Sequence, residues 1–154
     1  MNIRIILLGK DKDRWLSEAL GEFQKRLIPF CRLEILQLMD ISIRQTGSSQ
    51  QVIQKEGKKV LARLDEDDYV ILLEERGEEK SSLEFSQFLT KLSDKKRIVF
   101  VIGGVYGTSE DLALRAQFKM SLSRMTFTHR LSRLILIEQI YRAMMISSGR
   151  SYHT

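Results

Sequence analysis

The clearest signal of the fold is the segment Ile98-Val-Phe-Val-Ile-Gly-Gly-Val-Tyr-Gly107. Its five consecutive apolar residues, rich in β-branched side chains, predict a strand that is covered on both faces. The glycines that follow predict a tight turn at the carboxyl end of this strand. Ser109, followed by Glu110 and Asp111, then predicts the start of a helix, because serine caps a helix and acids favour its positive end.

The same strand, loop and helix unit occurs along the whole chain. We expect further strands at residues 3–8, 33–38, 69–73 and 121–127, and a loop at residues 74–80. The matching helices are one that Asp11 caps and Pro29 stops, one over residues 52–64, one opened by the capping box Ser81-Ser-Leu-Glu84, and a last one over residues 131–148. Five such units with apolar strands predict an α/β fold, with a parallel sheet between two layers of helices.

Composition limits the class of protein. The 154 residues, of which 43% are hydrophobic and 29% charged, are sufficient for one domain over residues 1–154. Cys31 is the single cysteine, and with two histidines the chain has too few ligands for a structural metal. The apolar run at residues 5–8 is far shorter than the about 18 residues that cross a bilayer, and no signal peptide precedes it. We therefore expect a cytoplasmic protein with no metal and no membrane segment.

Basic residues concentrate in the last quarter of the chain. Residues 115–154 hold seven basic side chains and one acid, Glu138, while the whole chain carries a net charge of +5. This uneven distribution predicts a surface for a polyanion, built from that quarter. Ordinary solvated arginines would give the same count.

The last predicted helix is apolar around nearly its whole circumference. Such a helix must be buried on all sides, and at the end of a small domain a second copy of itself is the readiest cover. We therefore predict a homodimer. The alternative is a central helix wholly inside one subunit, although so short a chain has few layers to cover it.

Three loops are expected to meet at the carboxyl edge of the sheet, where open parallel sheets bind ligands. They are residues 73–77, 103–107 and 122–128. The glycines of the second loop let the backbone approach a ligand closely, although turn glycines occur without any ligand. Neither a Walker Gly-Lys-Ser/Thr motif nor a Gly-x-Ser-x-Gly elbow is present, which disfavours nucleotide triphosphate and serine hydrolase chemistry.

Reactive side chains gather near the end of the chain. Glu138 and Arg142 are four residues apart on one helix face and can pair, either to hold Arg142 ready for a phosphate or base or to fix a dimer interface. Tyr152 and His153 follow in the tail. A frayed tail would be inert, whereas a tail folded back on the helix would present a histidine that titrates near neutral pH.

Four motifs, in order and at matching spacing, are similar to those of one known family. They are Phe100-Val-Ile-Gly-Gly-Val-Tyr-Gly107, Ser121-Leu-Ser-Arg-Met-Thr-Phe-Thr-His129, Glu138-Gln-Ile-Tyr-Arg-Ala143 and Tyr152-His153. The chain resembles the SPOUT-class large-subunit rRNA methyltransferase H family over its whole length. The resemblance implies a homodimer that uses S-adenosylmethionine to methylate N3 of pseudouridine 1915 in 23S rRNA of the assembled 70S ribosome. It also implies an α/β domain with a C-terminal trefoil knot.

The resemblance also implies the site residues. The family's cofactor loops fall on Leu73, Gly104, Ser123, Arg124, Met125, Thr126, Phe127 and Thr128. We expect His153 to act as base or positioner at the acceptor nitrogen, and Tyr152 to hold the target ring. Arg142 would bind phosphate or the uracil oxygens, oriented by Glu138.

The chain departs from this family at two loop positions. Thr128 and Ser151 stand where many relatives have proline. The loss of proline predicts a looser cofactor loop and a looser tail, with no reacting group removed.

Two other classes of protein are compatible with the same residues. A non-catalytic RNA- or ribosome-binding factor of the same fold would use a surface of Arg124, Arg130, Arg133 and Arg150. A flavodoxin-like nucleotide or flavin binder would have no need for RNA affinity, which the basic last quarter argues against.

Overall fold

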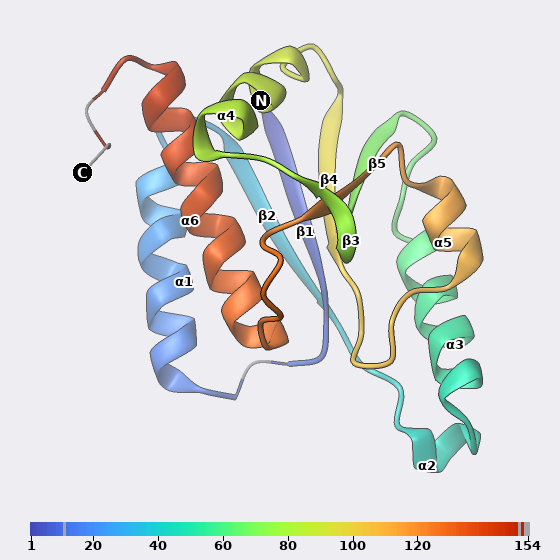
Figure 1. The fold of residues 1–154 in the computed structure, drawn as a ribbon. Coiled ribbons are helices and arrows are strands. Elements are labelled where there is room, and N and C mark those ends of the chain that lie inside the picture. The colour runs from blue at the N-terminus through green and yellow to red at the C-terminus, as the bar shows by residue number, and fades with distance from the viewer. Residues whose placement is uncertain (11, 151, 153–154) are drawn as a thin grey trace.

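The computed structural model describes residues 1–10, 12–150 and 152. Its centre is a five-stranded sheet in which every neighbouring pair of strands is parallel (Figure 1). The strands are β1 (Asn2–Leu8), β2 (Arg32–Leu38), β3 (Asp68–Glu79), β4 (Arg97–Ile102) and β5 (Phe118–Ser121), in the order β2-β1-β4-β3-β5 across the sheet. The predicted α/β fold with a parallel sheet is therefore confirmed.

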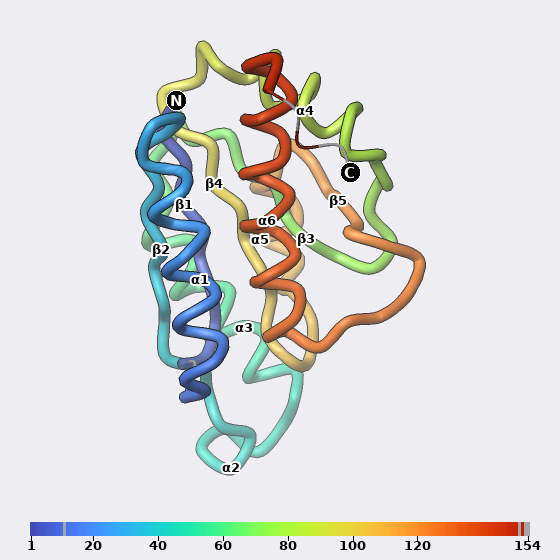
Figure 2. Tube along the Cα trace, turned by 90° about the vertical axis from the view of Figure 1, so that its left-hand side faces the viewer, coloured from blue at the N-terminus to red at the C-terminus, as the bar shows by residue number. Residues whose placement is uncertain are grey.

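Helices cover both faces of this sheet (Figure 1 and Figure 2). On one face lie α1 (Arg14–Leu27), α4 (Ser82–Lys91) and α6 (His129–Ser147). On the other lie α3 (Ser49–Leu61) and α5 (Glu110–Arg115), with the short α2 (Ile43–Thr46) leading into α3. The two layers bury the strands between them, as the apolar strand sequences require.

The central strand β4 shows how the sequence specifies this arrangement. Phe100 faces α1, α4 and α6, in register between Ile5 of β1 and Ile71 of β3. Its neighbours Val99 and Val101 face α3 and α5. These two side chains, like those of Phe100, Ile5 and Ile71, are buried. Burial on both faces removes apolar surface from water, at about 25 cal/mol for each Å².

Most predicted element boundaries lie within two residues of the observed ones, but α3 begins and ends three residues before the predicted range 52–64. The strands β1, β2 and β4 each begin one residue earlier than expected, and Ser81 and Ser109 cap α4 and α5 as predicted. The start of α1 differs, because Asp13 and not Asp11 stands at its capping position. Asp11 itself lies outside the described residues.

Two predictions are wrong at the edge of the sheet formed by β3 and β5. β3 continues to Glu79 through residues expected to form a loop, because after a bulge between Leu73 and Glu78 it pairs with β5. β5 ends at Ser121, where a strand over 121–127 was expected to begin. There the Ser121 hydroxyl donates a hydrogen bond to the Ser123 carbonyl (2.8 Å) and the chain turns into a loop.

Helix α6 is covered on one side only. Leu136 and Ile140 are fully buried in the core that α1 and α4 share with α6. By contrast, Leu131 is 42% exposed, and Ile135 and Met145 are half-buried. One chain thus leaves part of an apolar helix uncovered, so a wholly enclosed central helix is excluded. The homodimer, and the trefoil knot that the resemblance implies, stay predictions.

Within the described residues, no helix has the length and apolar character needed to cross a membrane.

The contact between β3 and β5 depends on Gly77, because a Cβ atom added there would lie 2.4 Å from the carbonyl carbon of Met120. We predict that Gly77→Ala lowers the free energy of unfolding by about 1–3 kcal/mol, since the strands must move apart. The matched control is Gly21→Ala in α1, where a Cβ atom would meet nothing within 4 Å. It should raise the free energy of unfolding by about 0.5–1 kcal/mol. Urea denaturation measures both, and a Gly77→Ala protein as stable as the wild type would contradict this contact.

Candidate functional site

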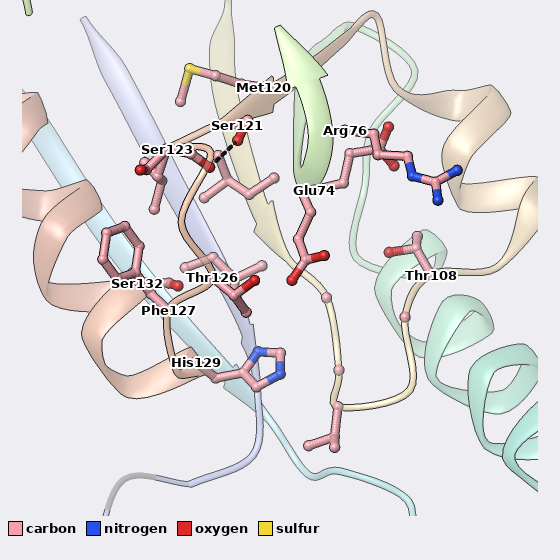
Figure 3. Close-up of a pocket in the computed structure, with 18 of the residues that line it drawn as sticks. Glu74, Arg76, Thr108, Met120, Ser121, Ser123, Thr126, Phe127, His129 and Ser132 are labelled. Carbon is pink, nitrogen blue, oxygen red and sulfur yellow. Dashed lines mark hydrogen bonds between the residues drawn. The ribbon is translucent and has the colours of Figure 1, made fainter. Parts of the chain in front are cut away.

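A cleft of about 830 Å³ opens at the carboxyl edge of the sheet, between the ends of β3, β4 and β5 and the start of α6 (Figure 3). The three loops expected to meet at this edge all line it, with residues 73–76, residues 103–108, and residues 122, 123 and 125–127. Ile102, Met120 and Leu122 give the wall apolar surface. The volume is in the range of small-molecule and cofactor sites.

Six of the eight predicted cofactor residues line the cleft. They are Leu73, Gly104, Ser123, Met125, Thr126 and Phe127. Arg124 is exposed and Thr128 belongs to the start of α6, and neither lines the cleft.

The glycine loop after β4 closes on itself. The Gly107 N–H donates to the Gly104 carbonyl (3.2 Å), and the two residues form an isolated antiparallel bridge. Gly107 has a φ of +105°, a backbone conformation that residues other than glycine rarely adopt. The loop therefore presents backbone groups to the cleft in a defined conformation.

The loop between β5 and α6 is held by short-range hydrogen bonds. The Met125 N–H donates to the Ser123 hydroxyl (3.0 Å), and the Leu131 N–H donates to the Thr128 hydroxyl (3.4 Å). Thr128 thereby caps α6, which a proline side chain has no acceptor to do. Thr128, which stands where many relatives have proline and was predicted to loosen this loop, therefore also caps the helix that follows. Ser151, the other replacement, lies outside the described residues.

His129, the first residue of α6, lines the cleft and was not assigned a role from the sequence. It is half-buried and lies beside the backbone of Gly103. Burial, together with the charge of Arg133, lowers the pKa of His129 below its usual value. A neutral imidazole therefore joins α6 to the glycine loop. In the sequence, His129 is marked only by its position as the last residue of the motif that begins at Ser121.

Three charged residues from β3, Glu74, Glu75 and Arg76, also line the cleft. Figure 3 shows the Glu74 carboxylate pointing into the cleft, while Arg76 points toward Thr108 on its other side. The Nζ atom of Lys119 lies 3.9 Å from Oε1 of Glu74. All three residues from β3 follow Leu73 in a loop predicted to reach this edge, but nothing in the sequence singled them out.

The predicted catalytic residues gather in a second place. Arg142 donates to Glu138 Oε1 from Nε (3.0 Å) and Nη2 (2.7 Å), and from Nη1 to the Tyr152 carbonyl (2.9 Å). Its guanidinium also lies 4.7 Å from the centre of the Tyr152 ring, and the centres of the Tyr152 and Tyr141 rings are 5.0 Å apart with their planes at 83°. The structure thus brings Glu138, Arg142 and Tyr152 together as expected. His153 lies outside the described residues.

This cluster is far from the cleft of the same chain. Arg142 follows His129 by 13 residues along α6, which corresponds to about 20 Å. A single chain therefore does not bring its own Arg142, or the Tyr152 that packs against it, to its own cleft.

Arg133 is not a surface residue. It is 5% exposed, and its guanidinium donates to the carbonyls of Leu8 and Gly9. The basic surface considered for a binding factor therefore loses one of its four arginines.

Among the described residues, no three His, Cys, Asp or Glu side chains lie close enough together to hold a metal ion.

Comparison with known proteins identifies the class. A family model described as "Predicted SPOUT methyltransferase" matches residues 1–153. Among solved structures, the tRNA (m1G37) methyltransferase from Aquifex aeolicus shares the fold, with a TM-score of 0.55 and 17% identity over 92% of this chain and 70% of that one. The chain belongs to the SPOUT methyltransferase family.

Full-length relatives narrow the class further. A protein of Carboxydothermus hydrogenoformans is 40% identical and one of Clostridium novyi is 43% identical, each over 158 aligned residues that cover 99% of both chains. Both are named "Ribosomal RNA large subunit methyltransferase H". These comparisons confirm the family that the four motifs indicated.

The lowered pKa of His129 predicts a pH dependence of stability. Because the folded state favours the neutral imidazole, His129 contributes to the free energy of unfolding. This contribution is present above the unfolded pKa of about 6.5 and is lost as the pH falls through the folded pKa. His129→Gln, which keeps an N–H donor, should lack this loss. Urea denaturation between about pH 5 and about pH 8 measures it. Parallel stability curves for the two proteins would contradict the assignment.

Proposed function

We propose that this protein transfers a methyl group from S-adenosylmethionine to N3 of pseudouridine 1915 in 23S rRNA, acting on the assembled ribosome. The observation that carries the proposal is the cleft at the sheet edge, where all three loops assigned by resemblance to the cofactor meet. The names of the full-length relatives support ribosomal RNA as the substrate.

The chemistry of the cleft fits this cofactor. Apolar side chains and the backbone of the glycine loop suit a neutral adenosine, and the Glu74 carboxylate suits the positive charge of the rest of the molecule. Bound there, S-adenosylmethionine would supply a methyl group on a positively charged sulfur, already a strong electrophile. Leu73, Gly104 and residues 123–127 would hold and orient it, and orientation is the main requirement of such a transfer.

The acceptor nitrogen carries a proton that must leave, so a base or hydrogen-bond acceptor is needed beside it. We assign this role to His153, with Tyr152 positioning the target ring. Glu138 and the Tyr152 carbonyl fix the guanidinium of Arg142 from two sides. An arginine oriented in this way suits a phosphate or the uracil oxygens.

The distance between the cleft and this cluster favours a homodimer. The part of α6 left uncovered by its own chain, including Leu131, Ile135 and Met145, would pack on a second copy. If the two helices run in opposite directions, the cluster of one subunit reaches the cleft of the other. Each complete site then contains residues from both chains.

The charge of the chain suits an RNA substrate. A net charge of +5 and a pI of about 9.4 favour binding to a polyanion, and Arg124 and Arg130 are exposed on and beside the cleft loops. We expect the complex with rRNA to weaken steeply as salt rises, because phosphate contacts release counterions. Ribosomes as substrate place the reaction in the cytoplasm.

The direct test is methyl transfer from labelled S-adenosylmethionine to 70S ribosomes lacking the modification, with free 23S rRNA in parallel. We predict that label enters one pseudouridine of the ribosomal RNA, mapped by mass spectrometry, and that intact ribosomes are the better substrate. Incorporation at another base would contradict the target. Binding of cofactor and ribosomes without incorporation would point instead to the non-catalytic factor.

A further inference from the structure

Glu56, on α3, is a buried acid with one unsatisfied oxygen. The residue is 4% exposed, and its Oε1 atom accepts a hydrogen bond from the Ile41 N–H (3.0 Å). Its Oε2 atom has no hydrogen-bond partner in the part of the chain that the structure describes. Because a buried polar atom without a partner is costly, this arrangement calls for an explanation.

The unsatisfied oxygen lies against the glycine loop of the cleft. A Cβ atom added to Gly104 would be 2.1 Å from Glu56 Oε2 and 3.0 Å from the carboxyl carbon. The carboxyl group therefore occupies the space that a side chain at position 104 would need. Gly104 itself lines the cleft, so Glu56 supports the loop from behind.

The next residue of α3 supports the far end of the same loop. A Cβ atom added to Gly57 would be 2.0 Å from the Ser109 hydroxyl, which caps α5 immediately after the loop. Glu56 and Gly57 thus contact both ends of the segment 104–109. The sequence suggested that these glycines let a ligand approach, whereas at position 104 the close neighbour is a side chain of α3.

We propose that Glu56 is a positioning residue of the cofactor cleft, whose carboxyl group sets the place of the glycine loop through its contact with Gly104. The inference rests on the proposed function, since it takes S-adenosylmethionine to be the ligand of that cleft. Glu56 acts through the loop and does not touch the ligand.

The protonation state of Glu56 decides how well it performs this role. Burial raises the pKa of Glu56, and the nearby Asp40 raises it further, while the hydrogen bond from Ile41 and the charge of Lys59 lower it. From the glycine loop itself, the one titratable side chain is that of the exposed Tyr106. An ionised Glu56 places an unpaired negative oxygen against the loop, whereas a protonated Glu56 does not. Cofactor affinity should therefore fall as the pH rises through the folded pKa of Glu56.

The first experiment compares cofactor affinity in the wild type and in Glu56→Gln, which mimics the protonated acid. Calorimetric titration with S-adenosylmethionine at a series of pH values should show the wild-type Kd rising by about threefold to tenfold relative to that of Glu56→Gln as the pH passes through the folded pKa of Glu56. The matched control is Glu66→Gln, which changes an exposed acid remote from the loop and should follow the wild type. Identical Kd values for wild type and Glu56→Gln at every pH would overturn the proposal.

The second experiment tests the contact itself. Gly104→Ala should weaken cofactor binding by about tenfold or more, because the new methyl group collides with the Glu56 carboxyl. Combining it with Glu56→Ala removes the collision and should restore most of the affinity. If Gly104→Ala weakens binding equally in both backgrounds, the glycine is needed by the ligand and not by Glu56, and the proposal fails.

A readout without cofactor separates this inference from the proposed function. Because the folded pKa of Glu56 is raised, its contribution to stability is full below the unfolded pKa and is lost as the pH rises through the folded pKa. Urea denaturation should therefore show Glu56→Gln losing less stability than the wild type over that range. A wild type that binds no S-adenosylmethionine at any pH would refute the proposed function alone, whereas superimposable stability curves would refute the role of Glu56.

Discussion

The stiffness of helix α6 is the constraint on which the site depends. Its 19 residues span about 28 Å, with His129 at the cleft and Arg142 near the opposite end. Because one end packs beneath the sheet edge and the other holds Glu138 and Tyr152, no local adjustment brings the two together in one chain. We propose that a second subunit, placed on the exposed side of the same helix, joins them.

The cleft is held from both layers of helices. On the α6 side, His129 lies beside the backbone of Gly103, and on the α3 side Glu56 and Gly57 pack against Gly104 and Ser109. The glycine loop thus lies between two titratable groups whose pKa values are shifted by burial in opposite directions. Both shifts favour the neutral form of the side chain beside the loop, because charge is costly in this part of the protein. A cofactor site that is lined by backbone groups needs such support, because the loop that lines it has few side chains to fix its own position.

Local sequence patterns predicted the features that depend on near neighbours. The apolar run of β4 and the serines that cap α4 and α5 were identified, and the carboxyl-edge rule placed three loops at one site. The extension of β3 was missed because its charged residues 74–79 are ordered by pairing with β5, a long-range contact. The role of Glu56 was missed for the same reason, since nothing near it in the sequence indicates that Gly104 lies against its carboxyl group. Glu138, Arg142, Tyr152 and His153 were singled out by their place near the end of the chain, and the family resemblance supplied their roles. The distance of Arg142 from the cleft became visible only when the helix could be followed in space.

The measurement that tests the composite site most directly uses mixed dimers of two inactive variants. Gly107→Val strains the cleft loop at a φ of +105°, and Arg142→Ala removes the centre of the proposed catalytic cluster. Differently tagged chains are co-expressed, the mixed dimers are isolated with both tags, and methyl transfer to ribosomes is measured. A site shared between subunits predicts about half the wild-type activity, because one of the two sites in each mixed dimer is intact. Mixed dimers as inactive as either parent, or a protein from which no mixed dimers form, would contradict the account.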